Sequence, residues 1–156
     1  MTLTADARPP AGGQDDPEPP LGRFTLDAVS LFLFSAACGL THRIHYDEGY
    51  ARREGFDGLP VQGPLEGALV AEAFHAVARR SGRRLAALQI RHLRPVCARQ
   101  EFRLIHDAPR RVDAEGRARV GGKGDEIRFR LETGSGIALA AGTVILASLA
   151  PKAATA

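Results

Sequence analysis

The amino-acid sequence predicts an α+β fold: a single domain in which one long helix lies along a curved antiparallel sheet. Helical patterns fill the first half of the chain, and strand patterns separated by turn signals fill the second, an order typical of this class. The chain has 156 residues, of which 44% are hydrophobic and 25% charged. That composition is typical of a globular domain that buries its own core. We therefore expect one domain, at residues 21–150.

Both ends of the chain differ from this domain. Residues 1–20 are rich in proline and glycine, carry a short acidic patch and offer almost nothing apolar to bury, so we expect a disordered tail. Residues 151–156 are expected to form a flexible C-terminus. No basic start leads into an apolar block of signal-peptide length, and no segment approaches the roughly 18 apolar residues of a membrane helix. We expect a cytoplasmic protein with no membrane partner.

Charge and cysteine content exclude several classes of site. Cys38 and Cys97 lie far apart without CxxC spacing, which indicates neither a zinc knuckle nor a disulfide framework. We expect both to be reduced and buried. The formal charge of +3 and a pI near 9.3 indicate a basic surface that attracts an anion. Nucleic acid is not an expected partner, because no recognised motif or basic stripe interleaved with aromatic residues accompanies the charge.

The first helix is expected at residues 27–37. Thr25 is its expected cap, Asp27 falls in the first turn, and Gly39 is placed to end it. The segment is rich in apolar side chains, so we expect it to be buried on most sides. Residues 40–62 follow as a predicted loop with at most a short helical turn around residues 46–52.

The strongest helix is predicted to open at Gly63-Pro64 and to run to about Arg80, where Ser81-Gly82 ends it. Proline is expected at the first helical position, where its missing N–H costs the helix no hydrogen bond. Small side chains along the helix allow it to lie close to a sheet. Apolar positions recurring every four residues form a core-facing stripe of Leu65, Leu69, Ala73 and Val77, with Ala68 and Ala76 beside it.

The period then changes to two, which indicates strands. In the first, ending near Pro95, alternate residues fall on opposite faces: Ala86, Leu88, Ile90 and His92 on one, and Leu85, Ala87, Gln89 and Arg91 on the other. Further strands are expected around residues 102–105, 127–131 and 137–149. The glycine-rich segment 121–124 lacks the Lys-Ser/Thr ending of a phosphate-binding loop, so we interpret it as a hairpin or irregular connection.

Groups that transfer protons concentrate in the segment His42-Arg43-Ile44-His45-Tyr46-Asp47. Histidine exchanges protons near neutral pH, and the positive N-terminus of the helix that opens at Gly63 can polarise a carbonyl. A metal site at His42 and His45 is disfavoured because no third ligand converges on them. An acyl-thioester site is therefore the leading hypothesis.

This segment, together with Gly58-Leu59, Val61 and Gly63-Pro64-Leu65, resembles the MaoC-like dehydratases and (R)-specific enoyl-CoA hydratases. The resemblance is nearest to the branch with mitochondrial-type hydroxyacyl-thioester dehydratases and mesaconyl-CoA hydratases. Residues 90–96 also look like that branch's strand after the central helix. The resemblance covers about residues 24–148. It implies a hotdog fold, assembled as a homodimer or higher homo-oligomer.

The resemblance also implies roles for particular residues. His45 matches the motif histidine that acts as acid and base, and the Gly63 N–H matches the donor that polarises the thioester carbonyl. His42 or Asp47 would orient water, although Asp47 can equally brace the turn through backbone N–H groups. Two positions depart from the family pattern. Leu40 stands where an Asp or Asn is usual, and Gln62 stands where a histidine precedes the helix-opening glycine.

Residues expected to contact the substrate surround this motif. Four arginines at the end of the long helix, Arg79, Arg80, Arg83 and Arg84, favour the helix dipole without any ligand. They are also candidates for binding coenzyme A phosphates, with Arg91, Arg94 and Arg99 as rivals on the strand side. The sequence assigns no role to His75, His92 or His106. The predicted substrate contacts are Gln62, Pro64, Arg43, Arg91 and Arg94.

The sequence thus predicts reversible hydration of a 2-enoyl thioester of coenzyme A or of an acyl carrier protein, without a metal or organic cofactor. Leu40 and Gln62 leave a second hypothesis, a non-catalytic hotdog subunit that binds an acyl thioester or completes a mixed dimer. A thioesterase is the third, because a fold does not determine its chemistry.

Overall fold

The computed structural model describes residues 20–112 and 124–148. The expected flexible C-terminus lies outside these ranges. So does the expected N-terminal tail, except for Pro20, and the glycine-rich segment 121–124, except for Gly124. No helix in the described part of the chain is both long and apolar enough to cross a membrane.

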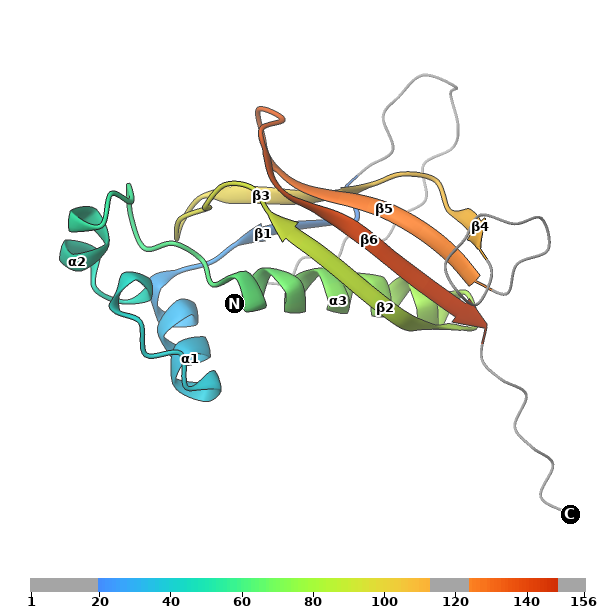
Figure 1. The fold of residues 1–156 in the computed structure, drawn as a ribbon, viewed down its shortest axis with the longest axis horizontal. Helices are drawn as coiled ribbons and strands as arrows, with labels where there is room; N and C mark the ends of the chain where they lie inside the picture. The colour runs from blue at the N-terminus through green and yellow to red at the C-terminus, as the bar shows by residue number, and fades with distance from the viewer. Residues whose placement is uncertain (1–19, 113–123, 149–156) are drawn as a thin grey trace, which may run out of the picture.

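The described strands form a six-stranded antiparallel sheet with one long helix along it, which confirms the predicted α+β architecture (Figure 1). The strand order is β1-β3-β5-β6-β2, with β4 pairing to β5 off this path. Strand β2 is therefore an edge strand. The strands are β1 (Gly22–Thr25), β2 (Arg83–His92), β3 (Glu101–His106), β4 (Arg110–Val112), β5 (Gly124–Thr133) and β6 (Ala138–Ser148).

Helix α3 (Gly63–Arg80) has the bounds that the sequence predicts, and it packs against the sheet (Figure 1). Gly63 is its first residue, so Pro64 takes the second helical position and not the first. The buried face is broader than the predicted stripe, because it also includes Phe74, whose ring centre lies 5.9 Å from that of Phe129 in β5. Ala68 is exposed. An unpredicted polar residue, Glu66, is buried on the same face.

The face assignment predicted for β2 is correct only in part. A β-bulge interrupts its pairing with β6 between Leu85 and Ala87. A bulge adds one residue and reverses the alternation. Leu85 therefore packs against the core together with Leu88 and Ile90, whereas Ala86 is exposed.

Helix α1 (Ala28–Cys38), the short 3₁₀ helix η1 (Arg43–His45) and α2 (Glu48–Arg53) lie together beyond one end of the sheet (Figure 1). Asp27 caps α1, since its carboxylate accepts a hydrogen bond from Ser30 N at 2.7 Å. The prediction that Thr25 is the cap is wrong, because Thr25 ends β1. Gly39 ends α1 in the left-handed conformation, with φ of 66°, as predicted.

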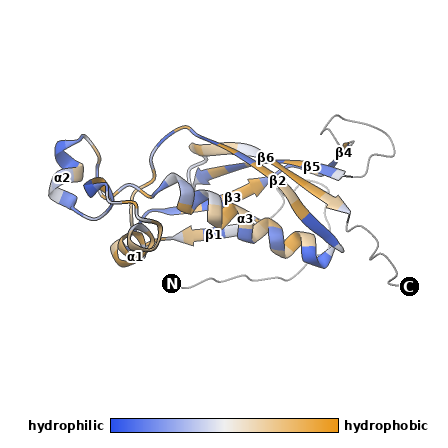
Figure 2. Ribbon diagram, turned by 60° about the horizontal axis from the view of Figure 1, so that its bottom comes forward, coloured by the Kyte–Doolittle hydropathy of each residue, from blue (hydrophilic) through white to orange (hydrophobic). Residues whose placement is uncertain are grey.

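The expectation that α1 is buried on most sides is also wrong. Only Leu31 and Ser35 of this helix are buried, while Val29, Phe32 and Leu33 are between 53% and 62% exposed. Figure 2 shows α1 as a mostly hydrophobic helix that stands apart from the sheet. Both cysteines are free, but Cys38 at the end of α1 is exposed, and only Cys97 is buried as expected.

Candidate active site

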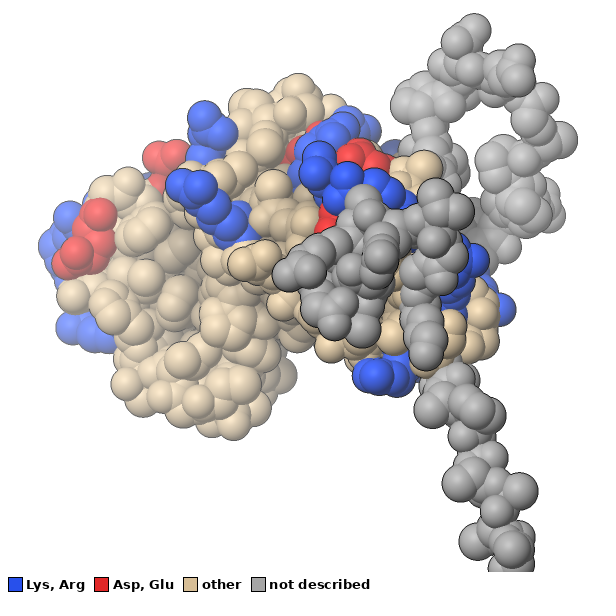
Figure 3. All heavy atoms as spheres, turned by 45° about the vertical axis from the view of Figure 1, so that its right-hand side comes forward, with Lys and Arg blue, Asp and Glu red and all other residues tan. Residues whose placement is uncertain are grey.

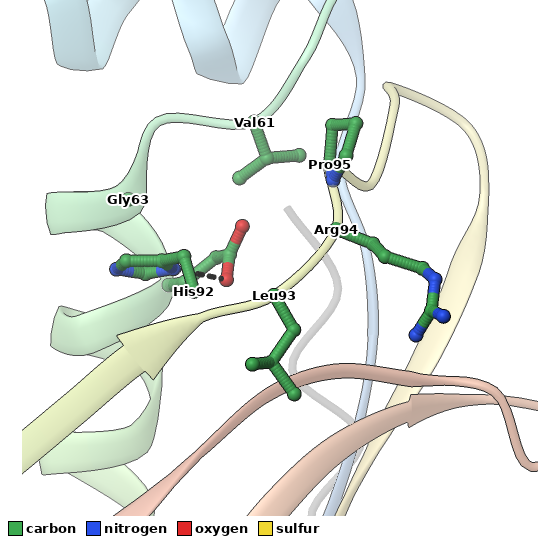
Figure 4. Close-up of a pocket in the computed structure, with 7 residues that line it drawn as sticks. Val61, Gly63, His92, Leu93, Arg94 and Pro95 are labelled. Carbon is green, nitrogen blue, oxygen red and sulfur yellow. Dashed lines mark hydrogen bonds and ion pairs between the residues drawn. The ribbon is translucent and has the colours of Figure 1, made fainter.

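The first turn of α3 opens onto a pocket of about 380 Å³ (Figure 4). Its lining includes Val61 and Gly63 from the start of the helix and the segment that follows β2. The N–H groups of a helix's first turn have no partner within the helix. No acceptor in the described part of the chain engages the Gly63 N–H. The lining residues are Val61, Gly63, Glu66, His92, Leu93, Arg94 and Pro95.

His45 is tied to the segment that leads into this helix. Its Nδ1 lies 2.8 Å from the carbonyl oxygen of Pro60, three residues before Gly63. A carbonyl only accepts, so Nδ1 carries the proton, and Nε2 is left free to accept one. Pro60 is itself fixed by a β-bridge to Cys97. The half-buried imidazole of His45 is therefore anchored to the segment that leads into α3, and it is not among the residues that line the pocket.

His42 and Asp47 are engaged in local structure. The Nδ1 atom of His42 accepts from Ile44 N at 3.4 Å at the start of η1, and its ring centre lies 6.3 Å from that of His45. Asp47 caps α2 through Tyr50 N at 2.9 Å. Its carboxylate also pairs with Arg43 at 2.5 Å. The backbone hydrogen bond from Tyr50, followed by the bond from Arg43, holds the Asp47 pKa below its usual range.

Gln62, predicted to contact the substrate, is instead a packing residue. It is 1% exposed, and its amide nitrogen donates to Leu31 O at 2.8 Å and to Ser35 Oγ at 2.9 Å. These two bonds attach α1 to the start of α3. The Oε1 atom of Gln62 is buried without a hydrogen-bond partner among the described residues.

Two residues that the sequence interpretation missed join Gly63 in the pocket. His92, the last residue of β2, places Nδ1 3.0 Å from Glu66 Oε2 on α3, the bond that is dashed in Figure 4. Burial, opposed by the charge and hydrogen bond of His92, raises the pKa of Glu66. The sequence did offer two signals for this pair. Glu66 is a carboxylate among the apolar residues of a helix, and His92 is a histidine on the apolar face of a strand.

The predicted substrate contacts fall in different places. Arg94 lines the pocket, where Figure 4 shows its side chain directed away from His92, and its Nη1 donates to Ala138 O at 3.2 Å. Pro64 and Arg91 are exposed and do not line the pocket. Arg43 is held by Asp47 and lies over the Tyr50 ring, with 4.9 Å from its guanidinium carbon to the ring centre.

Many of the other arginines pair with carboxylates along the sheet. Glu132 contacts both Arg103 and Arg130, and Asp125 contacts Arg83 and Arg111. Although burial opposes it, hydrogen bonding from Arg130 and Arg103 keeps the pKa of Glu132 below its usual range. On the face that Figure 3 shows, basic side chains lie in separate groups, several of them beside acidic ones, and not in one stripe. No group of three potential metal ligands occurs within residues 20–112 and 124–148.

Residues 4–98 match the family model described as hydroxyacyl-thioester dehydratase type 2. The chain belongs to this family. Over 81 residues the chain is 40% identical to mesaconyl-C(4)-CoA hydratase of Chloroflexus aurantiacus. These residues make up 51% of this chain and 28% of that protein. The chain thus spans little more than a quarter of the length of this curated relative.

Solved structures confirm the hotdog fold of this family member. The R-hydratase PhaJ1 from Pseudomonas aeruginosa superposes with a TM-score of 0.67 at 19% identity, over 86% of each chain. The ChsH1-ChsH2 complex from Mycobacterium tuberculosis superposes with a TM-score of 0.66 at 14% identity, over 81% of this chain and 91% of that one. Both have the curled antiparallel sheet with a central helix.

Proposed function

We propose that this protein is an acyl-thioester hydratase or dehydratase, which adds water reversibly to a 2-enoyl thioester of coenzyme A or of an acyl carrier protein. The Gly63 N–H carries the proposal: it begins an 18-residue helix beside a pocket and has no acceptor in the described part of the chain. A carbonyl there accepts from a preorganised donor at a positive helix end, which stabilises the enolate that forms during reaction. Family membership supports the same reaction class.

We assign the acid/base role to His45. In hydration, the water oxygen bonds to C3, the water proton passes to a base, and C2 receives a proton. His45 suits one of these transfers because Pro60 O fixes the proton on Nδ1 and leaves Nε2 available. His42 remains the candidate for orienting water, since the Asp47 carboxylate is occupied by Tyr50 N and Arg43.

We propose that the reaction uses no metal or organic cofactor, the coenzyme or carrier being part of the substrate. Carbonyl polarisation and proton transfer each have a group of the chain to perform them. Arg94 at the pocket, and Arg91 nearby on β2, supply positive charge for the phosphates of coenzyme A. The exposed free thiol of Cys38 supports a reducing, cytoplasmic location.

A spectrophotometric assay tests the proposal. Purified protein should hydrate crotonyl-CoA or a branched or dicarboxylic 2-enoyl-CoA, measured as the loss of enoyl-thioester absorbance. Release of free thiol from the matching saturated acyl-CoA, followed with a thiol reagent, serves as the control and should stay at the buffer rate. Thiol release without hydration would identify a thioesterase instead.

The second candidate is a non-catalytic hotdog subunit that binds a thioester or completes a mixed dimer. Leu40, which cannot exchange a proton, and Gln62, whose amide is committed to α1, favour it. Tight thioester binding without turnover, or co-purification with a second hotdog chain, would support this candidate. Rapid hydration by a purified homo-oligomer would exclude it.

We further propose that the protein forms a homodimer, with α1 and the open edge of β2 as the contact surface. Val29, Phe32 and Leu33 expose an apolar patch, and edge strands present unpaired backbone groups. Similarity to a chain of the ChsH1-ChsH2 complex supports assembly.

Light scattering coupled to size exclusion tests the assembly. We expect a mass about twice the 16.7 kDa of one chain, and a shift toward the monomer for Phe32→Asp. Ala108→Asp is the matched control, since Ala108 is also exposed but lies beside β4, toward the other end of the sheet (Figure 1). A monomeric wild type at micromolar concentration would contradict the proposal.

A further inference from the structure

The Glu66–His92 pair joins two elements at the mouth of the candidate site. Glu66 lies in the first turn of α3, and His92 ends β2. Their side chains are 4% and 42% exposed, so a buried carboxylate holds an imidazole that reaches the pocket. Burying a carboxylate costs free energy that an ion pair often fails to offset. A purely structural role therefore explains the pair poorly, because apolar side chains at both positions would join helix and strand as well.

The free end of the His92 ring is directed at Gly63. A Cβ built on Gly63 would lie 2.9 Å from His92 Nε2 and 3.2 Å from Cε1. A larger residue at position 63 would have to displace the imidazole from this position. Since Nδ1 is held by Glu66, Nε2 is the nitrogen that meets a molecule bound at the Gly63 N–H.

The pair has the chemistry of a proton-transfer unit. When His92 Nδ1–H donates to Glu66 Oε2, Nε2 can accept a proton while the carboxylate stabilises the imidazolium that results. Burial, opposed by the charge and hydrogen bond of His92, raises the pKa of the Glu66 carboxyl above its ordinary value. Among the described residues, Glu66 from α3 is the charged side chain that contacts the ring, the Arg94 side chain of the pocket is directed away from it (Figure 4), and the paired strand β6 places Ala140 opposite His92.

We propose that His92 is the second acid/base group of this site and that Glu66 is its positioning residue. The inference rests on the proposed hydratase function and supplies the proton-transfer group that Leu40 cannot provide. One imidazole takes the proton of the water whose oxygen bonds to C3, and the other gives a proton to C2. The net proton count of the enzyme is unchanged once solvent returns each ring to its starting state.

Steady-state hydration of crotonyl-CoA by wild type, His92→Gln and Glu66→Gln tests this inference. We expect kcat to fall by about 10²-fold or more for His92→Gln. Glu66→Gln retains an acceptor for Nδ1–H, so we expect a smaller loss of kcat. Its pH profile should move its acidic limb to lower pH, because the imidazolium loses the carboxylate that stabilises it. His75→Gln, an exposed histidine on the same helix, is the control and should match the wild type.

A binding measurement separates the possible failures. In a titration with butyryl-CoA, the His92 ring resonances of the wild type should shift and those of His75 should not. If wild type hydrates crotonyl-CoA while both variants keep its kcat and pH profile, His92 loses its role and the proposed function stands. If wild type hydrates no enoyl-CoA, the proposed function fails first, and the inference with it. If His92→Gln does not fold, two results on other proteins can still overturn the inference. One is that the His92 resonances of the wild type do not shift with butyryl-CoA, and the other is that Glu66→Gln keeps the wild-type pH profile.

Discussion

Replacing His45 with alanine should reduce kcat/KM for enoyl-CoA hydration by about 10²- to 10⁴-fold, the range that a positioned acid/base side chain contributes. The Nδ1 atom of His45 is held by Pro60 O at 2.8 Å, so the loss falls on Nε2, the nitrogen that we propose exchanges protons with the substrate. Initial rates on crotonyl-CoA, with circular dichroism to verify the fold, measure the effect.

His45→Asn separates chemistry from structure. The asparagine amide can still donate to Pro60 O, but it has no group that exchanges protons near neutral pH. If His45 acts through Nε2, the asparagine variant should be as inactive as the alanine variant while unfolding at the wild-type temperature. Recovery of activity in His45→Asn would show that only the anchor to Pro60 matters, and equal rates for His45→Ala and wild type would remove the assigned role altogether.

Local sequence signals predicted the elements whose pattern is long. Helix α3 has the predicted bounds because Gly63-Pro64 and Ser81-Gly82 punctuate a sustained helical period. Strands β1 and β4, of 4 and 3 residues, were missed, since so few residues establish no period and their pairing to β3 and β5 is a tertiary event. The prediction that α1 is buried was wrong because it rested on local composition alone. The helix is apolar, but nothing in the described part of the chain covers most of it.

Residues of the candidate site that belong to one local motif were predictable from the sequence, whereas contacts between residues far apart in the sequence were not. His45 and Gly63 belong to one motif, and the structure connects them through Pro60. Glu66 and His92 lie 26 residues apart, and their contact depends on how β2 returns along α3. Gln62 illustrates the same limit, because its place before the glycine that opens α3 suggested a ligand contact, whereas its amide donates to Leu31 O of α1, 31 residues away in sequence.

Gly142→Val should destabilise the protein by about 3 kcal/mol or more, at the upper end of the range for overpacked cores. A Cβ at this position of β6 would lie 1.9 Å from the backbone oxygen of Gln89 in β2 and 2.8 Å from Phe129 Cζ. The strand backbone cannot yield without breaking the β2–β6 pairing, and Phe129 is held against Phe74 of α3. Thermal unfolding followed by circular dichroism should show a fall in Tm of roughly 6 to 12 °C.

Ala141→Val provides the matched control for this prediction. Ala141 neighbours Gly142 on β6, but successive side chains in a strand point to opposite faces, so the added methyl groups meet the outer face beside Arg91 and Arg130. Valine is favoured in strands, so this variant should unfold within about 2 °C of the wild type. Strand β2 pairs with β6 on both sides of Gly142 and ends at His92, whose ring lies against Gly63 in the first turn of α3. A Gly142→Val protein as stable as Ala141→Val would mean that β2 can move away from β6 at no cost, and the position of His92 against Gly63 would then not be fixed by the sheet.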